Sequence, residues 1–326
     1  MISSDDLGHV YTTGSSFRAR AEARQREYRA KVLRAGWSEH GHFLDELAAS
    51  EGRNFIVPEA FELASVRAAS GKGVNRKRTF SNMLSSQAMC FNVFSPLARD
   101  LGLAAVVLRP FFSPLAEVRS VAFEYTPANS VFGDQTGHGG VDCDLLIDAV
   151  WDDGSKAVIT IETKFVEPEF SNCGFRKPGR LAKGQAICSD DVPVAADHRL
   201  CLYAAKGYRY WQQTARLATL GEGALPNAGC PFGGPEWQLW VNHTLVHAEA
   251  DARGAQHAFF AVCAPAKNTV LLRDAILDRF QTRLANPETF RFLPLDDLLE
   301  HVGAVASEQP RLQAWADGLV ARYSGI

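Results

Sequence analysis

Three β-type segments between residues 118 and 167 constrain the fold of this 326-residue chain most strongly. Residues 118–125 (VRSVAFEY) alternate in character and carry β-branched and aromatic side chains, which predicts a strand. Residues 141–151 (VDCDLLIDAVW) and 157–167 (AVITIETKFVE) predict two more. A long loop rich in turn formers separates the first two segments, and the tight turn 152–155 separates the last two. The spacing predicts an antiparallel meander.

Helical segments surround these strands. Residues 79–97 (TFSNMLSSQAMCFNVFSPL) predict a helix before the meander, and 236–250 (EWQLWVNHTLVHAEA) predict another after it. Residues 255–265 (AQHAFFAVCAP) predict a buried strand. The order helix, three strands, helix, strand indicates an α/β fold with a mixed sheet flanked by helices. Further helices are expected at 205–220, 271–285, 294–306 and 310–323.

The N-terminal part differs in charge. We expect residues 1–78 to form a basic helical extension, and residues 79–326 to form the main domain. Residues 17–34 hold seven Lys or Arg against two Glu, and 38–70 look helical with interruptions near Gly52 and Pro58. A second basic cluster comprises Lys72, Arg76, Lys77 and Arg78. The extension is either a solvated helical face or a surface that contacts a nucleic-acid backbone.

Composition narrows the class of protein. The hydrophobic share of 46% and charged share of 22% are those of a globular protein. No apolar run approaches the roughly 20 residues that cross a bilayer, and no secretion signal is visible. The seven cysteines include no CxxC pair, which is typical of reduced thiols. We therefore expect a cytoplasmic protein that is not bound to a membrane.

The third strand segment contains candidate catalytic residues. Because side chains alternate along a strand, Glu162 and Lys164 project from the same side, with Thr163 and Phe165 on the other. Asp144 begins the preceding strand, and a short hairpin brings it close to Glu162. Two carboxylates and a lysine at one strand end are costly to bury unless they bind a cation or transfer protons. Mg²⁺ prefers such oxygen ligands.

Residues 141–167 resemble the core of the PD-(D/E)XK nuclease superfamily. Residues 80–97 resemble the helix before the sheet in its uncharacterised restriction-endonuclease-like branch, and 230–245 resemble the segment leading into the helix after it. The resemblance covers about residues 79–265. It implies a restriction-endonuclease-like fold and Mg²⁺, with Mn²⁺ as a substitute. It also assigns roles to particular residues: Asp144 and Glu162 as metal ligands, Lys164 acting on water and phosphate, and Gln238 near the active site.

Several assignments stay open at this stage. Some members of the superfamily use a further acidic residue before the Asp, and Glu124 is the matching position. It is equally an edge-strand carboxylate in water. Cys143 stands where the "PD" name has proline, and Asp142 is an alternative ligand to Asp144 because it lies on the same strand face.

The resemblance implies an endonuclease that hydrolyses DNA phosphodiester bonds, with RNA open as a substrate and a homodimer compatible with cutting both strands. The rival function is a catalytically inactive nuclease-fold module that binds nucleic acid or another partner.

Other metal sites have weaker patterns. Cys173, Cys188, Cys201 and Cys230 with His198 lack the closely spaced ligand pair of structural zinc. His243 and His247 are four residues apart, without the HExxH signature, which favours a surface or packed pair.

Overall fold

The computed structural model of the chain describes residues 4–11, 14–71, 73–133, 140–176, 187–189, 191–227 and 229–326. Its longer helices are α2 (Ser16–Tyr28), α4 (Pro58–Ala69), α5 (Ser86–Arg99), α6 (Leu101–Leu108), α10 (Glu236–Arg253), α12 (Leu295–Glu308) and α13 (Gln313–Tyr323). Its shorter helices are α1 (Ser4–Leu7), α3 (Glu46–Ser50), α7 (Asn129–Phe132), α8 (Leu202–Ala205), α9 (Tyr210–Arg216) and α11 (Ile276–Gln281). Two π-helices are η1 (Arg29–Leu33) and η2 (Lys77–Ser81). Single 3₁₀ turns are η3 (Gly174–Arg176), η5 (His198–Leu200), η6 (Pro231–Gly233), η7 (Arg273–Ala275), η8 (Pro287–Thr289) and η9 (Pro310–Leu312).

The central sheet has five strands in the order β3-β4-β5-β6-β7. Its strands are β3 (Leu115–Tyr125), β4 (Cys143–Trp151), β5 (Lys156–Thr163), β6 (His257–Ala264) and β7 (Phe290–Pro294). β3, β4 and β5 pair antiparallel, which confirms the predicted meander, whereas β6 and β7 continue in parallel. All but the first residue of β5 are buried, which explains its continuous apolar run. The predicted α/β class with a mixed sheet is confirmed.

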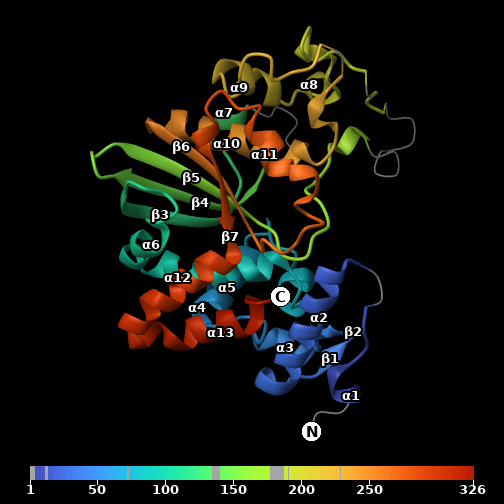
Figure 1. The fold of residues 1–326 in the computed structure, drawn as a ribbon, viewed down its shortest axis with the longest axis vertical. Helices are drawn as coiled ribbons and strands as arrows, with labels where there is room; N and C mark the ends of the chain where they lie inside the picture. Colours follow the sequence, from blue (N-terminus) through green and yellow to red (C-terminus); the bar gives the residue numbers. More distant parts are fainter. Residues whose placement is uncertain are drawn as a thin grey trace.

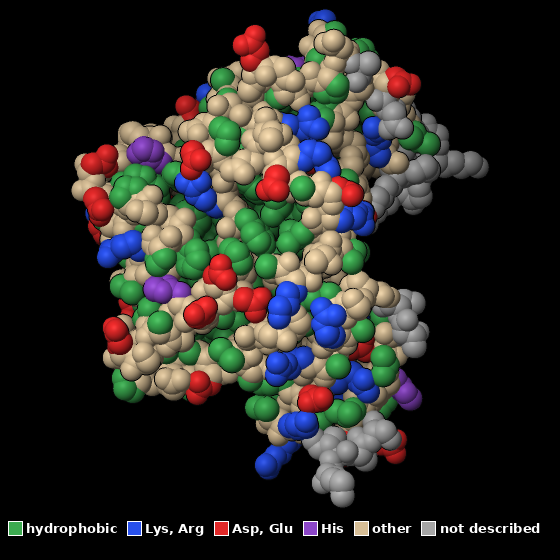
Figure 2. Space-filling view, in the orientation of Figure 1, with side chains coloured by type: hydrophobic (Ala, Val, Ile, Leu, Met, Phe, Trp, Pro, Cys, Tyr) green, Lys and Arg blue, Asp and Glu red, His purple; other side chains and the backbone are tan. Residues whose placement is uncertain are grey.

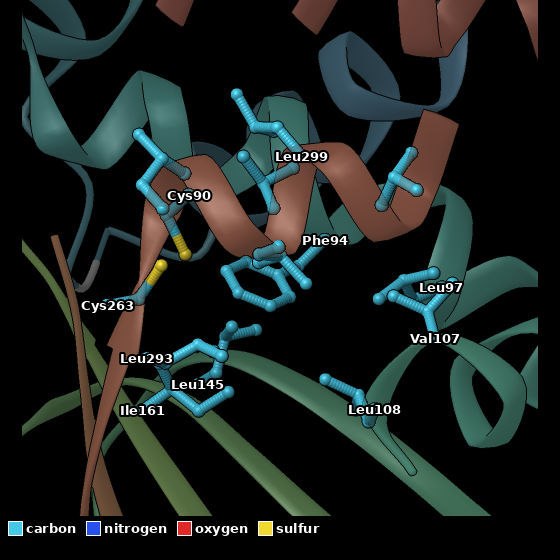
Figure 3. Close-up of a cluster of buried hydrophobic side chains, with 14 of the residues drawn as sticks. Cys90, Phe94, Leu97, Val107, Leu108, Leu145, Ile161, Cys263, Leu293 and Leu299 are labelled. Atoms are coloured by element: carbon cyan, nitrogen blue, oxygen red, sulfur yellow. The ribbon is translucent and has the colours of Figure 1, made fainter. Parts of the chain in front are cut away.

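Helices cover both faces of the sheet (Figure 1). On one face a core joins α5, α6, α12 and α13 to the sheet. Figure 3 shows this core, with Phe94 and Leu97 of α5 and Leu299 of α12 above Leu145 and Ile161 of the sheet. On the other face α10 packs over β5 and β6, through Leu239 and Val241 among others. The strand ends that carry the candidate site therefore lie between α5 and α10.

The N-terminal segment contacts the rest of the chain through buried groups. Phe17 and Ala21 of α2 belong to the same core as α5 and α13. Gln25 Nε2 donates to the Arg322 carbonyl at 2.7 Å, and Arg322 Nε donates to Gln25 Oε1 at 3.0 Å. Arg29 is also buried, with its guanidinium on backbone carbonyls such as that of Gly41 at 2.8 Å. The boundary at residue 78 stays a prediction.

Several predicted elements were wrong. Residues 38–70 are not all helical, because β1 (Trp37–Ser38) and β2 (His40–Leu44) form a hairpin before α3 and α4. The helix expected at 271–285 is reduced to α11, since Asp274 and Ala275 adopt φ values of 56° and 47°, outside the helical region. The helix expected at 205–220 is reduced to α9. Strand β7 was missed.

The small polar residues of segment 79–97 are buried or half-buried. Ser85 is the N-cap of α5, and its hydroxyl accepts the Ala88 N–H at 3.3 Å. Asn92 is buried, and its amide donates to the Asn54 carbonyl at 3.0 Å and to Tyr323 at 2.9 Å. These groups tie α5 to the N-terminal segment and to α13.

Across the described residues, no single helix is long and apolar enough to cross a membrane. Helices α5 and α6 meet that criterion only when taken together, and they are bent by 119° at the break between them.

Candidate functional site

The predicted acids meet where the β4–β5 ladder ends. Leu145 pairs with Ile161 at the last register position, so Asp144 and Glu162 come next on their strands. Lys164 lies just beyond β5, and its backbone N–H donates to the Cys263 carbonyl at 2.9 Å. The hairpin therefore brings the three residues to one end of the sheet, as the alternation and spacing predicted.

Glu162 is buried and accepts hydrogen bonds at both carboxylate oxygens. Lys164 Nζ and Gln238 Nε2 each donate to Oε1 at 2.6 Å. Asn242 Nδ2 donates to Oε2 at 2.9 Å. Gln238 and Asn242 are four residues apart, so they project from the same face of α10. One strand and one helix thus fix the orientation of this carboxylate.

Asp144 has a different partner. Its Oδ2 accepts both the backbone N–H of Thr163 at 2.7 Å and the Thr163 hydroxyl at 2.5 Å. Thr163 Oγ1 also lies 3.4 Å from the carbonyl of Ser86, near the start of α5. Glu162 therefore turns toward α10, while Thr163, the next residue, holds Asp144 near α5. Asp144 is half-buried, whereas Asp142 is exposed, which favours Asp144 as the site residue.

Glu124 is the third acid of the site. It is buried near the end of β3 with φ of 48°, an uncommon value for a residue with a side chain. Gln87 Nε2 donates to its Oε1 at 2.6 Å, and Arg67 donates to its carbonyl. The interpretation as an edge-strand carboxylate in water is wrong, because this side chain is 6% exposed.

Burial and the charge of Asp144 raise the pKa values of Glu124 and Glu162. Burial is the main cause of a Glu124 pKa of about 9, and the charge of Asp144 adds to it. Burial and Asp144 likewise raise the pKa of Glu162 to about 7, against the opposing charge of Lys164. Burial alone would lower the pKa of Lys164, but Glu162, Glu167 and Asp144 outweigh it and raise the pKa. The site therefore disfavours ionisation of Glu124 and Glu162 while it keeps Lys164 charged.

This donor set suits a hard divalent cation. The carboxylates supply oxygen ligands only, and a bound cation would favour the charged form of Glu162, which burial and the charge of Asp144 disfavour. Over the part of the chain that the structure describes, no group of three or more His, Cys, Asp or Glu side chains is arranged to hold a metal. A site formed by Asp144 and Glu162 needs only two such side chains, with water completing the shell.

Comparison with known families identifies the fold. The family model described as "PD-(D/E)XK nuclease superfamily" matches residues 12–189 and 233–325. The chain belongs to the PD-(D/E)XK nuclease superfamily. Neither the curated proteins nor the solved structures give a significant match. Residues 190–232 lie outside the family match, which begins within the basic N-terminal segment.

Membership in the superfamily agrees with the predicted site but assigns no roles to its residues. The structure brings Glu162, Lys164 and Gln238 into direct contact and places Asp144 beside them. Glu124 is buried nearby, where burial and the charge of Asp144 raise its pKa, and it accepts a hydrogen bond from Gln87. The catalytic and metal-binding roles of the five predicted residues stay predictions.

Sequence reasoning missed the residues that hold the acids, namely Gln87, Thr163 and Asn242. The spacing of Asn242 from Gln238 is a signal that could have indicated it, because both lie on one helix face. Alternation along β5 predicted that Thr163 lies on the side opposite Glu162. Its bond to Asp144 could not be predicted, because it depends on the position of Asp144 at the end of β4. Nothing in the sequence links Gln87 to Glu124.

The other candidate metal sites are not formed over the described residues, where no three His, Cys, Asp or Glu side chains are arranged to hold a metal. The four cysteines of the loop-rich region are free but lie near one another, since Cys201, Cys188 and Cys173 add to the rise that burial causes in the pKa of Cys230. His198 stacks on Trp211 at 4.7 Å between ring centroids. His243 and His247 form a packed pair, with 3.3 Å between their Nε2 atoms. They line a cavity of about 460 Å³. Gly71-Lys72-Gly73 lacks the Walker spacing, and Lys72 lies outside the described residues.

Proposed function

We propose that the protein is a metal-dependent endonuclease that hydrolyses phosphodiester bonds in DNA. The observation that carries the proposal is the buried carboxylate of Glu162, which Lys164 and Gln238 both contact at 2.6 Å beside Asp144. Hydrolytic nuclease activity is the general property of the superfamily to which the chain belongs. The position of these residues at one strand end supports the proposal.

Asp144 and Glu162 would hold Mg²⁺, with Mn²⁺ as a substitute. Glu124, the third predicted ligand, is not included, because over the described residues no three such side chains are arranged to hold a metal. When bound, such an ion lowers the pKa of water and stabilises charge that develops on phosphate. Lys164 would then act as a cation beside the scissile phosphate, because its raised pKa keeps it protonated. Gln238 would orient water or substrate with its amide, whose oxygen accepts the Ser171 N–H at 2.8 Å.

Exposed basic residues lie close to this site. Arg78 Nη2 donates to the Ser86 hydroxyl at 2.9 Å and lies 3.3 Å from the Glu167 carboxylate, three residues after Lys164. Arg76 and Lys77 are exposed beside it on the same segment. Figure 2 shows Lys and Arg side chains gathered over the N-terminal part of the molecule, on the face in view. They would neutralise backbone phosphates without reading sequence, in DNA or in RNA.

One observation favours the rival function. Both oxygens of Glu162 already accept hydrogen bonds from the protein, so the carboxylate is satisfied without a metal. A catalytically inactive module that binds nucleic acid or another partner would retain the fold and the basic surface but bind no cation at this site.

Cleavage assays separate the two functions. Purified protein is incubated with supercoiled plasmid and with single-stranded DNA, in Mg²⁺, Mn²⁺ or EDTA. Lys164→Ala is compared with Lys156→Ala, which removes an exposed lysine at the other end of β5. Metal-dependent cutting that Lys164→Ala loses and Lys156→Ala keeps supports the nuclease. Binding of DNA without cutting in any metal supports the inactive module.

A further inference from the structure

Helix α10 contributes two amides to Glu162, and they contact different oxygens. Gln238 shares Oε1 with Lys164, each at 2.6 Å, while Asn242 donates to Oε2 at 2.9 Å. Within the described part of the chain, Asn242 is the one hydrogen-bond partner of Oε2. The two oxygens therefore have distinct surroundings, one with the predicted catalytic residues and one with Asn242.

Asn242 is well fixed for such a contact. It is 1% exposed and sits on α10 between Val241 and Leu245, both packed in the core over β5 and β6. A carboxylate only accepts hydrogen bonds, so the Asn242 amide nitrogen must face Oε2. A hydrogen bond to a charged acceptor contributes more than one between neutral groups. Asn242 can therefore resist rotation of the Glu162 carboxylate.

We propose that Asn242 is a positioning residue that holds Oε2 of Glu162, so that Oε1 stays turned toward Lys164 and the carboxylate is fixed in the orientation in which it would hold a hard divalent cation. This inference rests on the proposed function, because it takes Glu162 as a metal ligand. Asn242 touches neither cation nor substrate. Because Asn242 already restricts the orientation of the carboxylate, Glu162 loses less conformational freedom when the cation binds. Groups that support metal ligands commonly act in this way.

Three variants test this role. Asn242→Leu removes the donor at similar volume, and Asn242→Asp replaces it with an acceptor of the same shape. The matched control is Thr244→Val on the same helix, which removes a buried hydroxyl that donates to the Trp240 carbonyl at 2.9 Å, away from Glu162. Mn²⁺ binding to each purified protein is measured by calorimetry, without substrate. Thermal unfolding in EDTA checks that each variant is folded.

We expect Asn242→Leu to weaken Mn²⁺ binding about 10- to 100-fold, and Thr244→Val to leave it within about 2-fold of wild type. Plasmid cleavage by Asn242→Leu should return to within about 5-fold of wild type at saturating Mn²⁺, because the ligand and the lysine are intact. Wild-type affinity in Asn242→Leu overturns the positioning role. Should that variant fail to fold, Asn242→Asp decides between the same outcomes.

The proposed function fails in a different way. If wild type and Glu162→Ala bind Mn²⁺ equally, or neither binds it, Glu162 is not a metal ligand and both proposals fall. If wild type binds Mn²⁺ at Glu162 and Asn242→Leu binds it equally well, the positioning role alone falls.

Discussion

The hydroxyl of Thr163 donates to Oδ2 of Asp144 at 2.5 Å, so the residue between Glu162 and Lys164 holds the other acid of the site. The Thr163 N–H reaches the same oxygen at 2.7 Å. The short Glu-Thr-Lys segment therefore supplies an acid, a support for the second acid, and a cation. Changes at its middle residue should affect the site although that residue faces away from Glu162.

We expect Thr163→Val to weaken Mn²⁺ binding about 10-fold, because it removes the hydroxyl bond to Asp144 while keeping the shape of the side chain. Calorimetric titration with Mn²⁺ measures the change. Thr163→Ser keeps the hydroxyl and should stay close to wild type. Equal affinity in the valine variant would show that the backbone N–H alone holds Asp144.

Glu124→Gln should stabilise the metal-free protein at pH 8. Folded Glu124 keeps its proton up to a pKa of about 9, whereas the unfolded chain releases it near the ordinary value of 4.5. Between these pH values the unfolded state binds fewer protons, so a rise in pH favours unfolding, by an amount on the order of a few kcal/mol. Glutamine carries no proton to lose and can still accept from Gln87.

Thermal unfolding in EDTA at pH 8 and pH 5 checks this expectation. The difference in Tm between Glu124→Gln and wild type should be large at pH 8 and small at pH 5. A stabilisation that is the same at both pH values would mean that titration of Glu124 is not its cause.

The packed histidine pair predicts sensitivity to acid. Burial lowers the pKa of His247 to about 4 and also holds that of His243 well below its ordinary value. Below about pH 6.5 these two histidines bind protons in the unfolded chain but stay neutral in the folded protein. The free energy of unfolding therefore declines as pH falls. We expect His247→Gln to reduce the decline between pH 6.5 and 5 by about 2 kcal/mol at most. Urea unfolding at several pH values measures the slopes, and parallel curves for the two proteins would contradict the expectation.

Arg322 should be among the most sensitive positions for stability. It is fully buried, and its guanidinium donates to Gln25 Oε1 at 3.0 Å and to the Asn54 carbonyl at 2.6 Å. We expect Arg322→Met to lower the free energy of unfolding by about 3 kcal/mol, since it leaves buried acceptors without a donor. Denaturant titration measures the loss.

The control for this change is Arg311→Met. Arg311 is exposed and pairs with Asp100 at 2.7 Å, an interaction worth at most about 1 kcal/mol. Similar losses in the two variants would mean that the buried contacts of Arg322 add little.

Much of the site could be predicted because it depends on local rules. Alternation along β5 put Glu162 and Lys164 on one side, and the tight turn to β4 brought Asp144 beside them. Helix α10 was predicted over 236–250 and extends to Arg253, after which Gly254 takes a left-handed conformation. Gln238 could be placed only through the resemblance to the superfamily.

What could not be predicted depends on contacts between distant segments. The bond of Gln87 to Glu124 joins α5 to β3, and no local pattern indicates it. Strand β7 is five residues long and lies between segments whose sequences predict helices. Only its pairing with β6 shows that it is a strand. The basic character of residues 17–34 suggested a solvated or phosphate-binding surface, yet Arg29 is buried as a structural donor.

The contact between Gln25 and Arg322 spans 297 positions in the sequence. During synthesis on the ribosome, α2 emerges long before α13, so this buried contact cannot form until α13 has been made. Bringing the ends of so long a loop together costs conformational entropy, which is offset only once the contact has formed. The segments around α2 and α13 should therefore assemble late. A chain interrupted before α13 would expose the polar groups of Gln25 and Asn54 together with the apolar surface of α5. Chaperones and proteases act on chains that expose such surfaces, so unfinished copies would be removed.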